Sequence, residues 1–72
     1  MRNGTVKFFL DDKGFGFVID DETGEEFFVH VSGRVDEIRK EDKVTFETEE
    51  GKKGINAVDV RKAWLKIYRF LH

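Results

Sequence analysis

Short apolar runs, separated by turn signals, constrain the fold of this chain most strongly. Between residues 4 and 60 the apolar segments are only a few residues long, proline is absent, and no long segment has the 3.6-residue period of a helix. This rhythm is typical of a small all-β domain. We expect strands at about 4–10, 14–20, 26–31, 43–49 and 55–61. Five strands in so short a chain predict a closed antiparallel barrel.

Three stretches have the residues of tight turns: DDKG at 11–14, DETG at 21–24 and EGKKG at 50–54. They predict hairpins that join the first strand to the second, the second to the third and the fourth to the fifth. The connection at 32–42, SGRVDEIRKED, is longer and highly charged. It is typical of the crossing between the two halves of a Greek-key barrel, and we expect Ile38 and Val35 to anchor it.

The length and composition restrict the setting in which the protein works. A chain of 72 residues forms one domain with a small core. The absence of cysteine excludes disulfides and thiolate metal sites and fits a reducing compartment. No apolar run resembles a signal peptide or the roughly 20 residues of a membrane span. We therefore expect a cytoplasmic protein.

Charge divides the chain into an acidic body and a basic tail. Residues 1–60 hold nine basic and fifteen acidic residues, whereas residues 61–72 hold four basic residues and no acidic one. An acidic body argues against a large phosphate-neutralising patch, which is the usual feature of tight duplex binders. A nucleic-acid ligand would therefore be held more by stacking than by charge.

The tail at 62–72 changes period. Its apolar side chains recur at spacings of three and four residues, which predicts a short basic amphipathic helix: Trp64, Ile67, Tyr68 and Leu71. Such a helix could pack on its own barrel, mediate a homodimer, or lie on a membrane or other anionic surface. The acidic body favours the first two roles, so we expect no membrane partner.

The second predicted strand contains KGFGFV at 13–18. Because side chains alternate across a strand, Phe15 and Phe17 share one face, and Gly14, Gly16 and Val18 share the other. The glycines raise a question, since they give the phenylalanines nothing bulky on the opposite face. We interpret the glycines as thinning the inward face and keeping the strand flexible, while the two rings are displayed for a ligand.

The third predicted strand, EFFVHV at 26–31, alternates in the same way. Phe28 and His30 share one face, and Phe27, Val29 and Val31 share the other. The face with Phe27 and Val29 is the more continuously apolar and joins Val18 in the predicted core. The opposite face then exposes an aromatic surface with cationic edges, made of Phe15, Phe17, Phe28 and His30 with Lys7, Phe8 and Lys13 close by.

Exposed aromatic clusters usually mark binding surfaces. Flat rings on adjacent strands can stack on unpaired bases, and each stack contributes about 1–3 kcal/mol whatever the base. A duplex hides the faces of its bases, so this surface would favour single strands. The alternative is that the rings form a second core against the tail or a partner protein.

Three segments resemble the cold-shock domain family, including both of its ribonucleoprotein-type motifs: VKFF at 6–9, KGFGFV at 13–18 and EFFVHVS at 26–32. The resemblance covers roughly residues 3–61, so we divide the chain into a cold-shock domain at 1–61 and the tail at 62–72. It implies a five-stranded Greek-key barrel of the OB-fold class. It also implies an RNA chaperone that binds single-stranded RNA or DNA, with a preference for pyrimidine-rich strands.

The same resemblance implies the nucleic-acid-binding residues. They are Lys7, Phe8, Phe9, Lys13, Phe15, Phe17, Phe28 and His30, with Phe9 partly buried beside the others. The chain departs from the family pattern at Phe8, where tryptophan is usual, at Leu10, where asparagine is usual, and at Val31, where phenylalanine is usual. Its long connection is also shorter and lacks an aromatic residue. These departures imply a shorter footprint and weaker binding than in a typical member.

Enzymatic activity is not expected. The sequence suggests no serine or cysteine nucleophile near His30. The acidic turns lack the spacing of a calcium loop, so we predict no metal and no cofactor. We predict a protein that traps unpaired bases and destabilises RNA secondary structure, in cold shock or in general transcription and translation. A protein-interaction or self-associating module with weakened nucleic-acid binding is the alternative, motivated by Leu10, Val31 and the acidic body.

Overall fold

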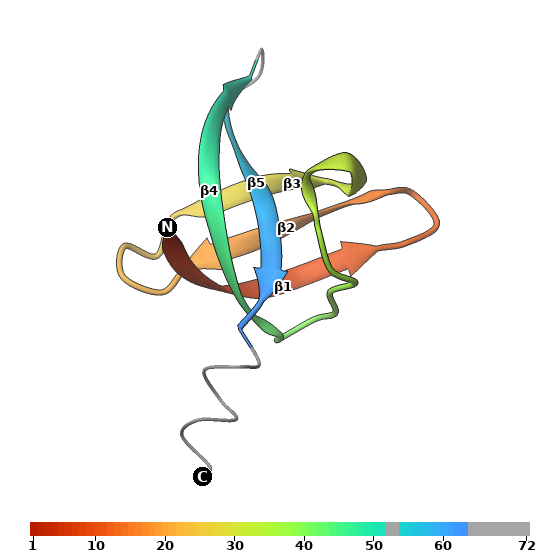
Figure 1. Cartoon of the computed structure of the whole chain (residues 1–72), viewed down its shortest axis with the longest axis horizontal. Coiled ribbons are helices and arrows are strands. Elements are labelled where there is room, and N and C mark those ends of the chain that lie inside the picture. Colours follow the sequence, from red (N-terminus) through yellow and green to blue (C-terminus); the bar gives the residue numbers. More distant parts are fainter. Residues whose placement is uncertain (52–53, 64–72) are drawn as a thin grey trace, which may run out of the picture.

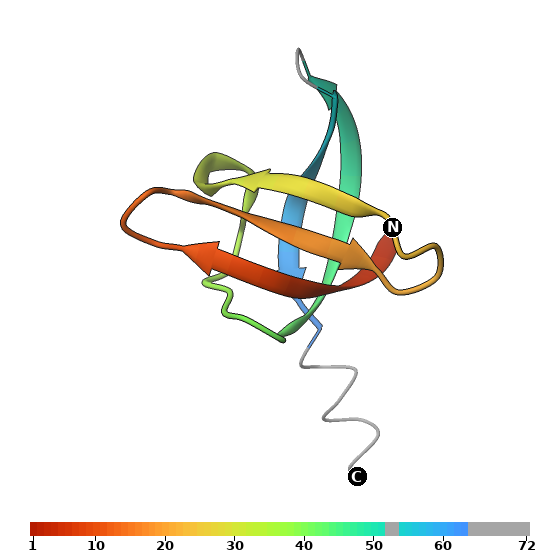
Figure 2. The same ribbon diagram turned by 180° about the vertical axis from the view of Figure 1, so that it is seen from behind.

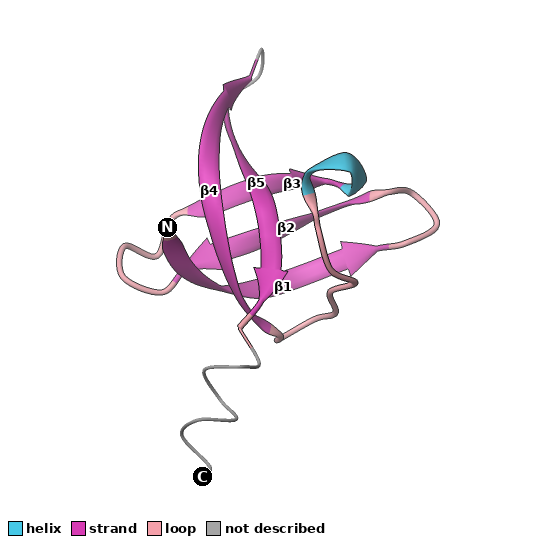
Figure 3. Cartoon of the chain, in the orientation of Figure 1, coloured by secondary structure: helices cyan, strands magenta, loops and turns pink. Residues whose placement is uncertain are grey.

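The computed structural model describes residues 1–51 and 54–63 and is built almost wholly of strands (Figure 3). The elements are β1 (Arg2–Leu10), β2 (Phe15–Asp20), β3 (Glu26–His30), the 3-10 turn η1 (Val31–Gly33), β4 (Lys43–Gly51) and β5 (Gly54–Lys62). Each expected strand is present. No helix within the described ranges could cross a bilayer. The expected tail helix begins at Lys62, which belongs to β5, and its residues 64–72 lie outside the described residues.

The five strands form a closed barrel in the order β1-β2-β3-β5-β4, which confirms the predicted all-β barrel and is consistent with an OB-fold. Figures 1 and 2 show β1 to β3 as a three-stranded layer that the long β4–β5 hairpin crosses. The expectation that all pairings are antiparallel is wrong at one place, because β3 and β5 pair in parallel at Phe28 and Asn56. In a closed ring with an odd number of strands, the directions cannot alternate all the way round.

The barrel interior holds Val18, Phe27 and Val29, as the alternation pattern predicted, together with apolar side chains from β1, β4, β5 and the β3–β4 connection. The buried set is Val6, Val18, Phe27, Val29, Ile38, Val44, Phe46, Ala57 and Val60. Phe27 and Phe46 pack against each other within it, with ring centroids 5.6 Å apart. Burying these apolar side chains supplies the main favourable term in folding.

The connection between β3 and β4 is anchored by one of its two expected apolar residues. Ile38 is buried, with 2% of its surface exposed, whereas Val35 is 50% exposed. The Val35 prediction is wrong because this part of the chain runs beside β5, where the Val35 backbone N–H donates to the Val60 carbonyl at 2.8 Å. Val31, expected on the inward face, is also 38% exposed, since the chain leaves β3 after His30 and turns into η1.

Asp20 fixes the β2–β3 turn and is the one buried charged residue of the described chain. Its carboxylate accepts the backbone N–H of Glu22 at 2.8 Å and that of Thr23 at 3.2 Å. Arg2 donates to the second carboxylate oxygen at 3.0 Å. The hydrogen bond from Glu22, helped by Arg2 and Thr23 and opposed by burial, holds the pKa of Asp20 below its ordinary value.

Candidate nucleic-acid interface

Four phenylalanines form a continuous surface on the outside of β1, β2 and β3. We call Phe8, Phe15, Phe17 and Phe28 the aromatic platform. Phe15 and Phe28 are stacked, with centroids 5.8 Å apart and planes 21° apart. Phe17 lies 5.5 Å from Phe8 and 5.7 Å from Phe28. All four rings are half-buried, because each covers part of its neighbours and leaves the rest of its surface to solvent.

A β-bulge at Lys7 brings Phe8 onto the platform. Val6 pairs with Val18 and Phe8 with Phe17, so Lys7 is the extra residue between them. In a regular strand Phe8 would share the inward face of Val6. The bulge shifts the alternation by one residue, as bulges do, so that Val6 is buried, Lys7 is exposed and Phe8 packs against Phe17.

The same shift turns Phe9 toward the barrel and explains the glycine between the two phenylalanines of β2. Phe9 pairs with Gly16 and packs against the core. A Cβ at Gly16 would lie 2.2 Å from the Phe8 carbonyl oxygen and 2.8 Å from the Phe9 ring. The interpretation that this glycine keeps the strand flexible is therefore replaced: it lets β1 and β2 approach closely.

The guanidinium of Arg34, from the connection after η1, lies over the Phe9 ring. The guanidinium carbon lies 4.7 Å from the centre of the Phe9 ring and Nη1 lies 2.9 Å from the Asp11 carboxylate. This cation–π contact and ion pair tie the β1–β2 turn to the β3–β4 connection. Among the expected site residues, Phe9 is therefore the one that packs against the core and does not join the outer face.

Two exposed lysines, Lys7 and Lys13, lie close to the platform in the sequence. Lys7 Nζ lies 2.6 Å from Glu26 Oε1, and both side chains are about half exposed. Lys13 is exposed in the β1–β2 turn, two residues before Phe15. A phosphate that approached Lys7 would have to compete with the Glu26 carboxylate, so the ion pair weakens the cationic edge on this side.

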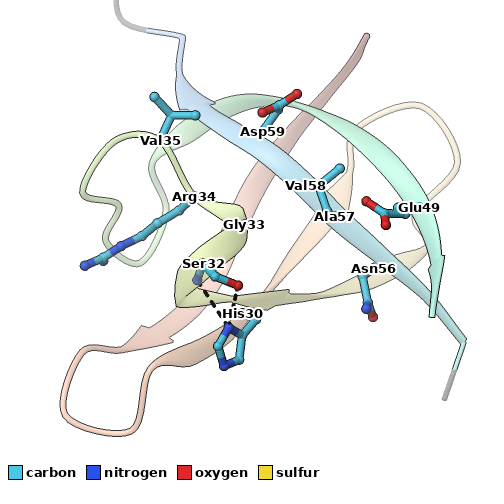
Figure 4. A pocket seen from close by; sticks show the side chains of 10 residues that line it. All are labelled: His30, Ser32, Gly33, Arg34, Val35, Glu49, Asn56, Ala57, Val58 and Asp59. Atoms are coloured by element: carbon cyan, nitrogen blue, oxygen red, sulfur yellow. Dashed lines mark hydrogen bonds between the residues drawn. The ribbon is translucent and has the colours of Figure 1, made fainter. Parts of the chain in front are cut away.

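His30 extends the surface beside Phe15, its partner in the β2–β3 register. Its Nδ1 accepts the backbone N–H of Ser32 at 3.2 Å and lies 2.8 Å from Ser32 Oγ (Figure 4). The expectation that no serine lies near His30 is therefore wrong. The contact caps η1, because it joins two residues of one turn. Since the Ser32 N–H points at Nδ1, the ring proton is placed on Nε2.

Known proteins resemble this chain over most of its length. Residues 2–63 match the 'Cold-shock' DNA-binding domain. The cold shock-like protein CspA of Shewanella violacea is 46% identical over 63 residues, which cover 82% of this chain and 90% of that protein. The cold shock protein CspC of Bacillus subtilis is 45% identical over 67 residues, which cover 88% of this chain and all of that protein. This chain belongs to the cold-shock domain family.

Membership supports a nucleic-acid-binding cold-shock function and does not favour the protein-interaction alternative.

Within this cold-shock domain, Leu10 and Val31, the two positions that depart from the family pattern at the rim, are both apolar and partly exposed. Leu10 pairs with Phe15, and Val31 lies against Gly14. Leu10 therefore extends the apolar border of the aromatic platform beside Phe15.

Two further residues lie in line with the platform, although sequence reasoning did not select them. Phe28 pairs with Asn56 across the parallel seam, and Asn56 pairs with Glu49 in the β4–β5 hairpin. Both line a hollow of about 370 Å³ between η1 and β5, beside His30 (Figure 4). Only the pairing of β3 with β5 brings them there, so no local sequence signal could have found them.

Proposed function

We propose that this cold-shock domain binds single-stranded RNA and DNA by stacking unpaired bases on the aromatic platform. The observation that supports the proposal is the continuity of the platform: four rings from three neighbouring strands pack against one another in a row, and each is only partly buried. Flat, sequence-tolerant surfaces of this kind are how OB-folds hold single strands. Paired bases cannot use them, because their faces are covered within the duplex.

The bound strand would be held by rings first and charges second. Phe15, Phe17 and Phe28 supply most of the stacking, and Phe8 adds a fourth ring at the edge. His30 adds a ring and an Nε2–H donor. Lys7 and Lys13 contact phosphates, with Lys7 giving up Glu26 as it does so. Phe9 acts from beneath, by holding β1 against β2.

Such binding would make the protein an RNA chaperone. Each stacked base gains about 1–3 kcal/mol, and each base-pair step of a DNA duplex is worth about 1.4 kcal/mol. Trapping three or four bases therefore offsets the loss of a few base pairs and shifts a short hairpin toward the melted state. Binding energy alone biases the equilibrium, so the proposal needs no nucleotide hydrolysis.

Several finer features of the proposal come from the sequence. We propose that the preferred strands are pyrimidine-rich, that the protein is cytoplasmic and is not an enzyme, and that the basic tail supports a homodimer. The opposite charges of the body and the tail support the last of these. Each stays a prediction, and a sedimentation measurement of the full chain would test the dimer.

The test is the fluorescence anisotropy of a labelled oligothymidine of about seven nucleotides, titrated at low salt and challenged with unlabelled duplex. We expect saturable binding that duplex does not compete. Phe17→Ala should weaken binding by about 1–3 kcal/mol, or roughly 5- to 150-fold, because Phe17 touches two other platform rings.

Ile55→Ala is the control, since Ile55 is exposed and lies outside both the platform and the hollow beside His30. Phe17→Leu keeps apolar volume while removing the ring, and it replaces the alanine variant if that variant does not fold. Equal affinity of the wild-type protein and a folded Phe17 variant would exclude the platform as the binding surface.

A further inference from the structure

One row of directly opposed residues takes one residue from each of the five strands of the barrel. Directly opposed residues of paired strands share a face. Phe8 is opposed to Phe17, Phe17 to Phe28, Phe28 to Asn56, and Asn56 to Glu49. The aromatic row therefore continues, on the same outer face, into an amide and then a carboxylate.

The polar end of the row opens on the hollow between η1 and β5. Glu49, Asn56, His30 and Ser32 line it (Figure 4). Its volume of about 370 Å³ is enough for one nucleobase. The Asn56 amide has room because position 51 is glycine, where a Cβ would lie 2.7 Å from Asn56 Nδ2. A base stacked at the Phe28 end of the platform would present its edge to these groups.

Glu49 limits what the hollow can accept. An ionised carboxylate only accepts hydrogen bonds, and it repels phosphates. Asn56 beside it can donate from Nδ2, so the pair offers one donor next to two acceptors. Guanine offers the complement on its pairing edge, namely an acceptor at O6 next to donors at N1 and N2. Uracil and thymine have a single N–H between two carbonyls, and adenine and cytosine each place a donor next to acceptors.

We propose that Glu49 and Asn56 form a base-reading site that selects an unpaired guanine at the end of the aromatic platform. This inference rests on the proposed single-strand binding and deepens it, because it adds one position of base specificity to an otherwise sequence-tolerant surface. A guanine bound there stacks at the platform edge, donates N1–H and N2–H to Glu49, and accepts from Asn56 at O6.

The experiment compares labelled oligothymidine of seven nucleotides with seven versions that each carry one guanine. We expect one position, or two adjacent ones, at which guanine tightens binding by about tenfold, as good bidentate contacts do. Hypoxanthine at that position lacks only the N2 amino group and should lose most of the gain. Glu49→Gln should reduce the guanine advantage to about twofold or less.

Glu50→Gln is the matched control, since it removes the same charge from the next residue of β4, which is opposed to Ile55 instead of Asn56. We expect Glu50→Gln to keep the guanine advantage. The inference is overturned if guanine gives no advantage at any position, if hypoxanthine equals guanine, or if Glu49→Gln keeps the preference. In those cases oligothymidine still binds, whereas failure of every oligonucleotide to bind would refute the proposed function itself.

Discussion

Gly16→Ala tests whether close packing of β1 against β2 builds the aromatic platform. The added Cβ would lie 2.2 Å from the Phe8 carbonyl oxygen and 2.8 Å from both Cα and the ring of Phe9. Unstrained carbon contacts lie at about 3.5–4 Å. The oxygen and Cα belong to the backbone and cannot rotate away, so β1 must retreat from β2 along the Phe8–Phe9 segment.

The loss of stability can be estimated from the cost of moving β1 away from β2. Overpacking usually costs about 1–3 kcal/mol, and we expect the upper end, about 3 kcal/mol, because a strand must move instead of a side chain. A chain of this length has a total stability of only about 4–10 kcal/mol at typical values per residue. Gly16→Ala should therefore remove about 30% or more of it, and it should also weaken oligonucleotide binding by displacing Phe8.

Urea unfolding followed by far-UV circular dichroism measures this change. Tryptophan fluorescence is a poor probe, since the sole tryptophan, Trp64, lies in the tail. With a slope of about 1 kcal/mol/M, the midpoint should fall by about 3 M. Gly33→Ala is the control, because the nearest atom to its Cβ is 3.2 Å away and it should cost less than about 1 kcal/mol. Similar stabilities for the two variants would refute the packing argument.

Two more predictions concern charged groups. The pKa of Asp20 is lowered in the folded protein, chiefly by the Glu22 N–H, so its contribution to stability is present above the unfolded value of 3.8 and is lost as pH falls through the folded value. Asp20→Asn should be less stable than the wild type at pH 7 and should lose less stability on acidification; parallel urea midpoints from pH 7 to 2.5 would contradict this. Glu26→Gln frees Lys7 from its 2.6 Å ion pair, so oligothymidine should bind more tightly, and the slope of log K against log salt should steepen by up to about 0.7, one phosphate contact; if both the affinity and the slope stay at their wild-type values, Lys7 contacts no phosphate.

Alternation alone was enough to place much of the site. A strand repeats every two residues, so the choice of Val18, Phe27 and Val29 as core fixes Phe17 and Phe28 on the opposite face. The structure confirms both halves of that prediction. The turns could also be predicted, because glycine and aspartate favour turns through their own backbone and side-chain chemistry.

Alternation failed wherever the backbone left the regular strand. The bulge at Lys7 reverses the phase of Phe8 and Phe9, and no nearby residue signals it. The prediction that Val31 faces inward failed because β3 ends at His30, where the His30 ring accepts the Ser32 N–H and caps η1.

The sequence by itself therefore determined an all-β barrel and one aromatic face, because strand period and turn chemistry act over a few neighbouring residues. Tertiary structure alone decided which strands meet. The parallel seam between β3 and β5 brings Asn56, and through it Glu49, into line with Phe28. Gly16 owes its role to Phe9, which only the pairing of β1 with β2 lays across it. Such contacts depend on how the ring of strands closes, and closure is a property of the whole chain.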